Sequence, residues 1–140
     1  MIMDIPDEFE MIYDSKDNVP VFRNYIDGSW KEVDVEMREI ESPYDRSLVA
    51  KVPKTPAKMV EKALESAANN RSKIRDVPAI ERIELFEKAS NILRMHEDTF
   101  VESLILEAGK PRHNAKGEVK ATINRLEMVA EEARKIFGEY

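Results

Sequence analysis

The sequence contains no cysteine and no glutamine, and only four of its 140 residues are glycine. Without cysteine, the chain can form neither a disulfide nor a thiolate metal site, so any redox chemistry has to come from elsewhere. No apolar run approaches the roughly 20 residues that a membrane-spanning helix needs. These absences exclude a disulfide-stapled fold, a cysteine metal centre and an integral membrane protein.

No strong charge imbalance is present either. The chain has 28 acidic and 22 basic residues, with a formal net charge of −6, and its basic residues alternate with acidic ones rather than clustering. Such a chain has no field that draws it to nucleic acid or anionic lipid, so we expect neither partner. The opening residues 1–10 match neither a secretory signal nor a transit peptide, and we therefore expect a cytoplasmic location.

The chain divides into two regions of different composition, 1–20 and 21–140. Residues 1–20 hold two small apolar clusters separated by acids, and we interpret them as an N-terminal arm that orders only against something else. The arm includes a loop-forming stretch at 14–18. Residues 21–140 have the composition of a single domain or of part of a larger one.

β-Structure is predicted at the start of the second region. The residues of 21–33 are rich in β-branched and aromatic types and surround Asp27-Gly28, a dipeptide that favours a tight hairpin turn. Two further extended segments, 38–42 and 47–52, flank a turn-like sequence at 42–46. We therefore expect a small, mainly antiparallel sheet.

The apolar period changes to that of helices after Pro56. Together with the sheet, about four amphipathic helices predict an α+β chain. The first should span 55–72, and the second should have Asp76 at or near its N-cap and Pro78 in its first turn. The expected apolar stripe of the second helix is Ile80, Ile83, Phe86, Ala89 and Ile92 or Leu93.

Glycine and proline separate the last two helices. Gly109 should end the third helix, with Pro111 following it, and the fourth should begin near Asn114 and lose its pattern at 137–140. The third helix presents Phe100, Val101, Leu104, Ile105 and Ala108 on one face. The inward residues of the fourth are expected to be Val119, Ile123, Leu126, Val129 or Ala130, Ala133 and Ile136.

Several polar residues resemble functional groups at first sight. His96 and His113 lie far apart in the sequence at expected helix boundaries, where a helix-end or surface role is favoured over metal binding or acid–base work. Glu107 and Glu118 flank the Gly-Lys-Pro corner. Charge interactions at helix ends account for their presence there better than a role as a pair of catalytic carboxylates. Lys110 lacks the glycine spacing and the following Ser or Thr of a phosphate-binding loop.

Three further polar residues are also not predicted to form a catalytic or modification site. Ser66 and Ser103 are not expected to replace a thiol nucleophile, because the sequence identifies no activating base for either. Asn70 begins a glycosylation acceptor pattern, which a cytoplasmic chain would not use. We therefore predict no catalytic, no cofactor-binding and no metal-binding residue.

A resemblance to a family rests on the order of several motifs. The segment 25–30 reads YIDGSW, 106–111 reads LEAGKP, and 117–119 reads GEV, with an alanine-rich and an arginine-containing helix between the first two. In this order they resemble the N-terminal part of the NAD(P)-dependent aldehyde dehydrogenases, such as those for lactaldehyde, succinate semialdehyde or glyceraldehyde and its phosphate. The resemblance spans about 25–140 and implies an incomplete N-terminal part of an α/β cofactor-binding domain over 21–140.

The same resemblance implies what the chain needs for activity. Family members oxidise an aldehyde to an acid with a cysteine nucleophile, a glutamate base, an oxyanion-stabilising asparagine and a glycine-containing dinucleotide turn, all of which follow the resembling segment. We therefore expect this chain alone to be inactive and to bind no cofactor, while NAD or NADP belongs to the complete enzyme. Neither the aldehyde nor the choice of nucleotide follows from the residues present.

In a chain this short, the sheet and helices must leave some apolar surface exposed. Such surface predicts that the chain binds a partner or a second copy. We expect the remainder of an aldehyde dehydrogenase, or a complementary chain, to bind it, and we expect self-association. The alternative is a stand-alone helical interaction or regulatory module derived from the same scaffold.

Overall fold

The structure is a computed structural model that describes residues 5–134, and the chain divides into two compact units. The first unit takes in the chain up to Ser72 together with Leu106–Gly109, and the second takes in Lys73–Ile105 and the chain from Lys110 onward. The division between an arm and a domain at residue 20 stays a prediction.

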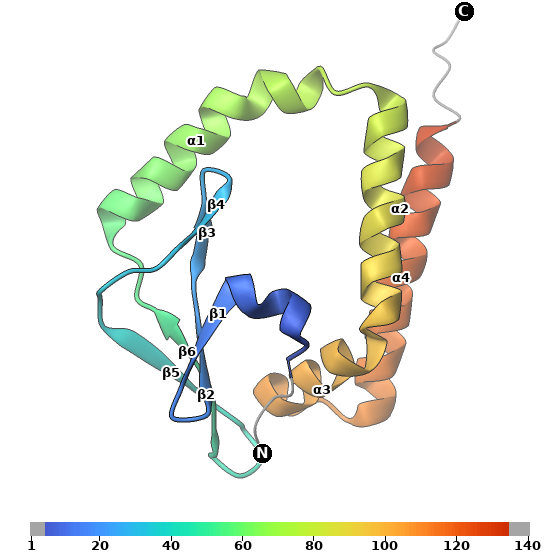
Figure 1. Cartoon of the computed structure of the whole chain (residues 1–140). Helices are drawn as coiled ribbons and strands as arrows, with labels where there is room; N and C mark the ends of the chain where they lie inside the picture. Colours follow the sequence, from blue (N-terminus) through green and yellow to red (C-terminus); the bar gives the residue numbers. More distant parts are fainter. Residues whose placement is uncertain (1–4, 135–140) are drawn as a thin grey trace, which may run out of the picture. The chain divides into compact units, whose positions relative to one another are not determined.

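A four-stranded sheet forms the centre of the first unit (Figure 1). The strand order is β1-β2-β6-β5, with antiparallel pairing at β1–β2 and β5–β6 and parallel pairing at β2–β6. The mainly antiparallel sheet predicted from the sequence is confirmed. The strands are β1 (Tyr13–Lys16), β2 (Val19–Phe22), β5 (Met37–Glu41) and β6 (Leu48–Pro53), and the 3-10 helix η1 (Asp7–Ile12) precedes them.

The predicted loop at 14–18 is too long. Asp17 and Asn18 alone form the turn, with φ of 54° and 62°, while residues 14–16 belong to β1. Strand pairing explains the difference, because β1 pairs with β2 along its whole length and the Tyr13 ring contacts Phe22 at a centroid distance of 6.0 Å.

One face of this sheet carries the apolar core of the first unit. Val49 and Ala50 of β6 are buried with Leu106, from the last turn of α3 (Glu97–Ala108), and Phe22 and Ile40 pack against them. A β-bulge between Ile40 and Glu41 shifts the register beside this cluster.

The predicted Asp-Gly hairpin is confirmed as a separate two-stranded ribbon of β3 (Asn24–Ile26) and β4 (Ser29–Lys31). Asp27 and Gly28 have φ of 53° and 73°, as a turn with two left-handed residues requires. The extended run predicted over 21–33 is divided, because residues up to Phe22 pair in the other sheet.

Helix α1 (Ala57–Arg75) confirms the first predicted helix, displaced by two or three residues at each end. Pro56 precedes it, and the Pro56 carbonyl accepts hydrogen bonds from the amides of Met59 and Val60 at 2.8 and 3.2 Å. None of the 19 residues in this helix is buried, although its sequence has an apolar stripe.

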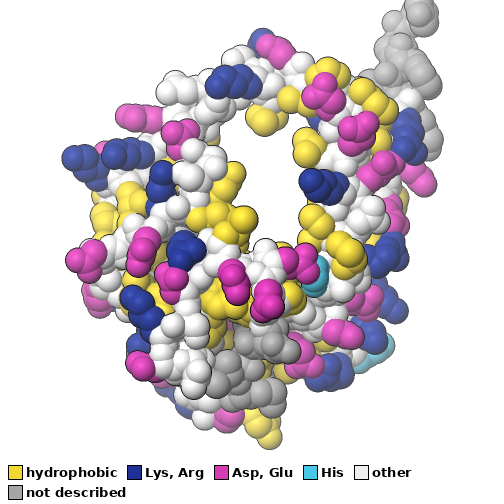
Figure 2. Space-filling view, viewed as in Figure 1, with side chains coloured by type: hydrophobic (Ala, Val, Ile, Leu, Met, Phe, Trp, Pro, Cys, Tyr) yellow, Lys and Arg dark blue, Asp and Glu magenta, His cyan; other side chains and the backbone are white. Residues whose placement is uncertain are grey.

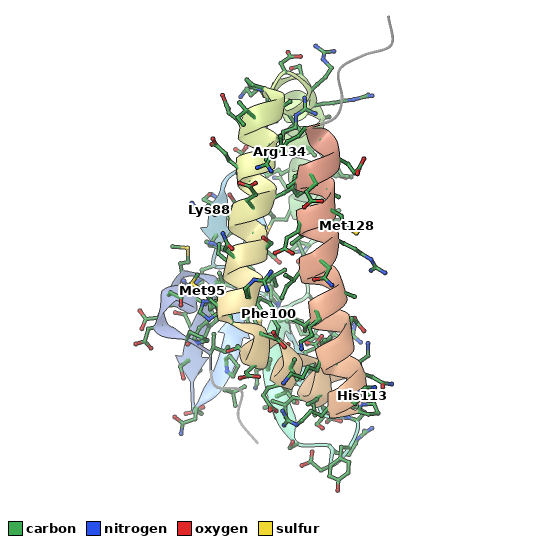
Figure 3. The ribbon with its side chains drawn as sticks, turned by 90° about the vertical axis from the view of Figure 1, so that its right-hand side faces the viewer. Lys88, Met95, Phe100, His113, Met128 and Arg134 are labelled. Carbon is green, nitrogen blue, oxygen red and sulfur yellow. The ribbon has the colours of Figure 1, made fainter. Side chains whose placement is uncertain are left out.

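Helices α2 (Ala79–Met95) and α4 (Arg112–Ala133) lie side by side in the second unit (Figures 1 and 3). The core cluster consists of Val101, Ala115, Val119 and Ile123, and Leu93, Phe100, Leu104 and Ile105 pack against it. Leu93 rather than Ile92 therefore reaches this cluster. Ala130 is buried whereas Val129 is exposed, so Ala130 rather than Val129 is the inward residue of α4.

Two details of the predicted helices are wrong: the cap at Asp76 and the inward position of Ile80. Asp76 does not cap α2: Pro78 occupies the N-cap with no side-chain cap hydrogen bond, and Asp76 pairs with Arg75 instead. The fourth predicted helix is confirmed as α4, which begins at Arg112, slightly before the expected start near Asn114, because the Pro111 carbonyl already accepts the amide of Ala115 at 3.0 Å. Ile80 was expected inward but is 58% exposed. The predicted roles of Ile136 and 137–140 lie outside the described residues.

Candidate functional site

The corner at Gly109 is the most constrained of the sequence motifs. Gly109 has a φ of 63°, and a Cβ atom there would lie 2.8 Å from Cγ of Pro43. Both the backbone conformation and the contact therefore require glycine. The predicted end of α3 is confirmed at this position, and the role of the glycine is structural.

Charged residues beside this corner pair locally in the second unit. The Lys110 ammonium pairs with Glu118, and the Arg112 guanidinium lies 2.5 Å from Glu102. The Lys110 amide also donates to the Leu104 carbonyl at 3.4 Å. The Arg112–Glu102 pair connects the start of α4 to α3, and the Glu118 carboxylate engages Lys110, which is therefore not presented to a phosphate.

The two histidines occupy helix ends. His96 is the C-cap of α2, where its amide donates to the Ile92 carbonyl at 3.1 Å, and its carbonyl accepts from the Phe100 amide at 3.1 Å. His113 is exposed in the first turn of α4 (Figure 3). Across the described residues, no group of His, Asp and Glu side chains is arranged to hold a metal ion.

The two serines considered as nucleophiles sit in different surroundings. The Ser66 hydroxyl donates to Asp27 Oδ1 at 2.8 Å, which attaches the β3–β4 hairpin to α1. Ser103 lines a hollow of about 200 Å³ in the second unit, and Glu118, which also lines it, is paired with Lys110. Glu118 beside Ser103 is thus engaged by Lys110, and the Ser66–Asp27 hydrogen bond is exposed at the surface. The Asn70 side chain donates to the Ser66 carbonyl at 2.8 Å within α1.

A hollow of about 560 Å³ beside the sheet was not foreseen from the sequence. Arg23, on its wall, is engaged by Asp14 at 2.5 Å and by the Met11 carbonyl at 2.8 Å, so its charge is neutralised within the fold. The lining residues come from three separate segments, which no local motif would connect. They are Asp14, Lys16, Val21, Phe22, Arg23, Glu32, Val33, Asp34, Val35 and Met37.

The turn between β5 and β6 is fixed by polar contacts. The Ser47 hydroxyl and amide donate to Asp45 Oδ1 at 2.7 and 3.0 Å, and these hydrogen bonds lower the pKa of the Asp45 carboxyl below its ordinary value near 3.8. Ser42 is buried, and its hydroxyl accepts the Tyr44 amide at 3.3 Å. Tyr44 itself is 91% exposed at the tip.

Exposed apolar side chains are the surface feature that remains after these polar groups are assigned. Figure 2 shows hydrophobic side chains at the surface among interspersed acidic and basic ones. Helix α2 exposes Leu85 and Met95, and α1 exposes Val60 and Leu64. The other large exposed residues are Met11, Tyr25, Trp30, Tyr44, Ile74, Ile80, Met128 and Val129. Among the helices of 5–134, none combines the length and apolar content that crossing a bilayer requires.

Comparison with known proteins connects this fold to one family. Residues 30–140 match the model of the aldehyde dehydrogenase family. The chain is 31% identical over 114 residues to the succinate-semialdehyde dehydrogenase [NADP(+)] of Saccharomyces cerevisiae, covering 81% of this chain and 23% of that protein. It is 32% identical over 123 residues to the succinate semialdehyde dehydrogenase of Acinetobacter baylyi, covering 86% and 26%.

Solved structures give the same result. Aldehyde dehydrogenase 21 from Physcomitrella patens, in complex with succinate, superposes with a TM-score of 0.81 at 27% identity over 85% of this chain and 25% of that one. Lactaldehyde dehydrogenase from Escherichia coli gives 0.78 at 26% identity over 85% and 25%. The chain thus spans about a quarter of the length of the relatives that it matches.

Proposed function

The chain belongs to the aldehyde dehydrogenase family, and from this premise we propose that it serves as the N-terminal portion of an NAD(P)-dependent enzyme that oxidises an aldehyde to a carboxylic acid. The observation that carries the proposal is the family match over 30–140 combined with coverage of only a quarter of each relative. The described site residues add no competing chemistry.

In this proposal the chain acts as a scaffold. The Gly109 corner and the hairpin attached through Ser66 are structural features, and Lys110 and Glu118 are engaged with each other. A thiolate nucleophile, donors for the developing oxyanion and a base for the deacylating water must come from another polypeptide segment. The chain alone is therefore inactive and binds no nicotinamide cofactor, and the assembled protein works in the cytoplasm.

A split-enzyme reconstitution tests this function. The chain is co-expressed with the C-terminal three-quarters of the A. baylyi succinate semialdehyde dehydrogenase, and reduced nicotinamide formation is followed with succinate semialdehyde and either NAD or NADP. The matched control pairs the same C-terminal polypeptide with that relative's own N-terminal quarter. We expect activity in both complexes and none from the chain alone.

The contrary result is an inactive mixture next to an active control. If the chain still binds the C-terminal polypeptide without restoring turnover, the alternative of an interaction or regulatory module is supported. If the isolated chain reduces nicotinamide in an aldehyde-dependent way, the scaffold role is wrong.

A further inference from the structure

Helix α2 has two apolar faces, and the second unit covers one of them. Glu87 pairs with Arg134, and Arg94 pairs with Glu127, so the side of α2 that carries Glu87 and Arg94 faces α4. Ile83 and Ser90 lie on the same side by helical spacing, and they are 3% and 2% exposed. Figure 3 shows α2 beside α4, with Arg134 between them.

The outer stripe of α2 consists of Leu85, Ile92 and Met95, which recur at intervals of seven and three residues and so share one face. Leu85 is 62% exposed and Met95 is 69% exposed, while Ile92 is half-buried. Met95 and Lys88 project from the side of α2 away from α4 (Figure 3). A surface helix carries one apolar stripe, whereas a helix that is apolar on two sides lies between two layers.

The comparisons indicate what supplies the second layer. Relatives carry about three-quarters of their length beyond the part that this chain matches. A polypeptide of that size offers a core large enough to cover a helix face, and burial of Leu85 and Met95 would remove their apolar surface from water. The exposed side of α4 is mostly polar. Its large exposed apolar residues are Met128 and Val129, which are adjacent in the sequence and so do not form a comparable stripe along the helix.

We propose that the outer stripe of α2 is the docking surface for the C-terminal three-quarters of an aldehyde dehydrogenase polypeptide. This assignment rests on the proposed function and specifies which helix face receives the partner. Lys88 lies within the same face, where its aliphatic stem packs beside the apolar contacts and its ammonium reaches the rim of the interface.

The test uses the A. baylyi C-terminal polypeptide as the probe and compares Leu85→Glu with Met128→Glu. The two positions are matched, since both are large apolar residues of helices in the second unit and are 62% and 61% exposed. We expect Leu85→Glu to weaken binding by about tenfold or more and Met128→Glu to change it by less than about twofold. Circular dichroism and thermal melting of each isolated variant verify that the fold is retained.

The absence of native cysteine allows a second readout. In Met95→Cys and Met128→Cys, mass spectrometry measures the rate at which maleimide labels each single thiol of the chain. Complex formation should slow labelling at position 95 by about tenfold or more and leave position 128 nearly unchanged, because docking buries only the former.

The possible outcomes distinguish a failure of the proposed docking surface from a failure of the proposed function. An active complex in which Leu85→Glu binds as well as Met128→Glu, or in which Cys labelling at 95 is unchanged, overturns the docking surface and leaves the proposed function standing. No binding by the unmodified chain, while the relative's own N-terminal quarter binds, overturns both. Protection of position 95 in the chain alone, with a concentration-dependent dimer, assigns the stripe to a second copy and overturns the proposed occupant.

Discussion

The two units of the molecule are specified by different physical means. In the first unit, the backbone makes tight turns at left-handed residues. Every residue with positive φ within 5–134 belongs to this unit, and the set is Asp17, Asn18, Asp27, Gly28, Arg46 and Gly109. In the second unit, regular helices are joined by one apolar cluster and by ion pairs between α2 and α4. Local backbone chemistry therefore shapes the first, and side-chain burial shapes the second.

This difference predicts where each unit is sensitive. A change of backbone freedom should affect the first unit most, because its turns fix the strand registers. A loss of side-chain volume should affect the second unit most, because four buried residues form the centre of its core cluster.

The largest effect is expected from Ile123→Ala in the second unit. Ile123 is 2% exposed in the core cluster, so truncation removes buried methyl groups and leaves a cavity. We expect the free energy of unfolding to fall by about 2–5 kcal/mol, measured by urea denaturation. Val129→Ala on the same helix, at a position 45% exposed, is the control and should lose much less. Equal losses would show that the cluster is not the centre of stability.

The next largest effect is expected from replacing a glycine by alanine, with opposite results at Gly109 and Gly117. Gly109→Ala places an alanine at a φ of 63° and its Cβ 2.8 Å from Pro43, so unfolding free energy should fall by about 1–2 kcal/mol from the backbone alone, with the contact adding to it. Gly117 lies in the N-terminal half of α4 and a Cβ there would have no atom within 4 Å, so Gly117→Ala should stabilise the chain by about 0.4–1 kcal/mol. Thermal melting of both variants should give shifts of opposite sign, and shifts of the same sign would contradict the contrast.

The ion pairs across α2 and α4 should contribute less than the apolar cluster beside them. Arg94 and Glu127 are 55% and 43% exposed at their side chains, so solvent screens their attraction. We expect Arg94→Ala to cost less than about 1 kcal/mol, and we expect the cost to shrink in high salt. A double-mutant cycle with Glu127→Ala measures the pair. A coupling as large as the Ile123→Ala effect would mean that charge, rather than burial, joins the helices.

The smallest effect is a pH dependence in the β5–β6 turn. Hydrogen bonds from Ser47 hold the pKa of Asp45 below its ordinary value near 3.8 in the folded chain. The stabilising contribution is therefore present above the unfolded value and is lost as pH falls through the folded value. Carbon NMR titration should find the lowered pKa, and Ser47→Ala should raise it toward the ordinary value. Because the backbone amide at position 47 still donates to Asp45 in this variant, a pKa that Ser47→Ala leaves unchanged would exclude the hydroxyl hydrogen bond as a cause.

The Asp-Gly turn and the glycine at the end of α3 are the most predictable parts of the fold. Asp27-Gly28 and Gly109 have local requirements that any surrounding structure must meet, and the structure confirms both positions. The cap predicted at Asp76 is wrong, because Pro78 takes the N-cap position of α2 and the carboxylate of Asp76 pairs with Arg75. A capping side chain and its possible partners can be recognised in sequence, but the sequence does not show which partner the side chain takes.

Surface and cavity features were less predictable because they join distant segments. The hollow beside the sheet combines residues from 14–23 with others from 32–37, and no periodic pattern relates the two. The helical pattern also does not predict that Ile80 is exposed, because such a pattern identifies an apolar face but not the residues that cover it. The prediction that no residue here is catalytic or binds a cofactor or metal stays a prediction.

The central claim is that this chain is one part of an aldehyde dehydrogenase. Its most direct test is affinity isolation of the tagged chain from its source, with mass spectrometry of the bound polypeptides and an aldehyde-dependent NAD(P) reduction assay on the eluate. The account predicts a stoichiometric partner that carries the cysteine-containing remainder of the family sequence, together with activity. A purified chain that carries no such partner and shows no turnover would contradict it.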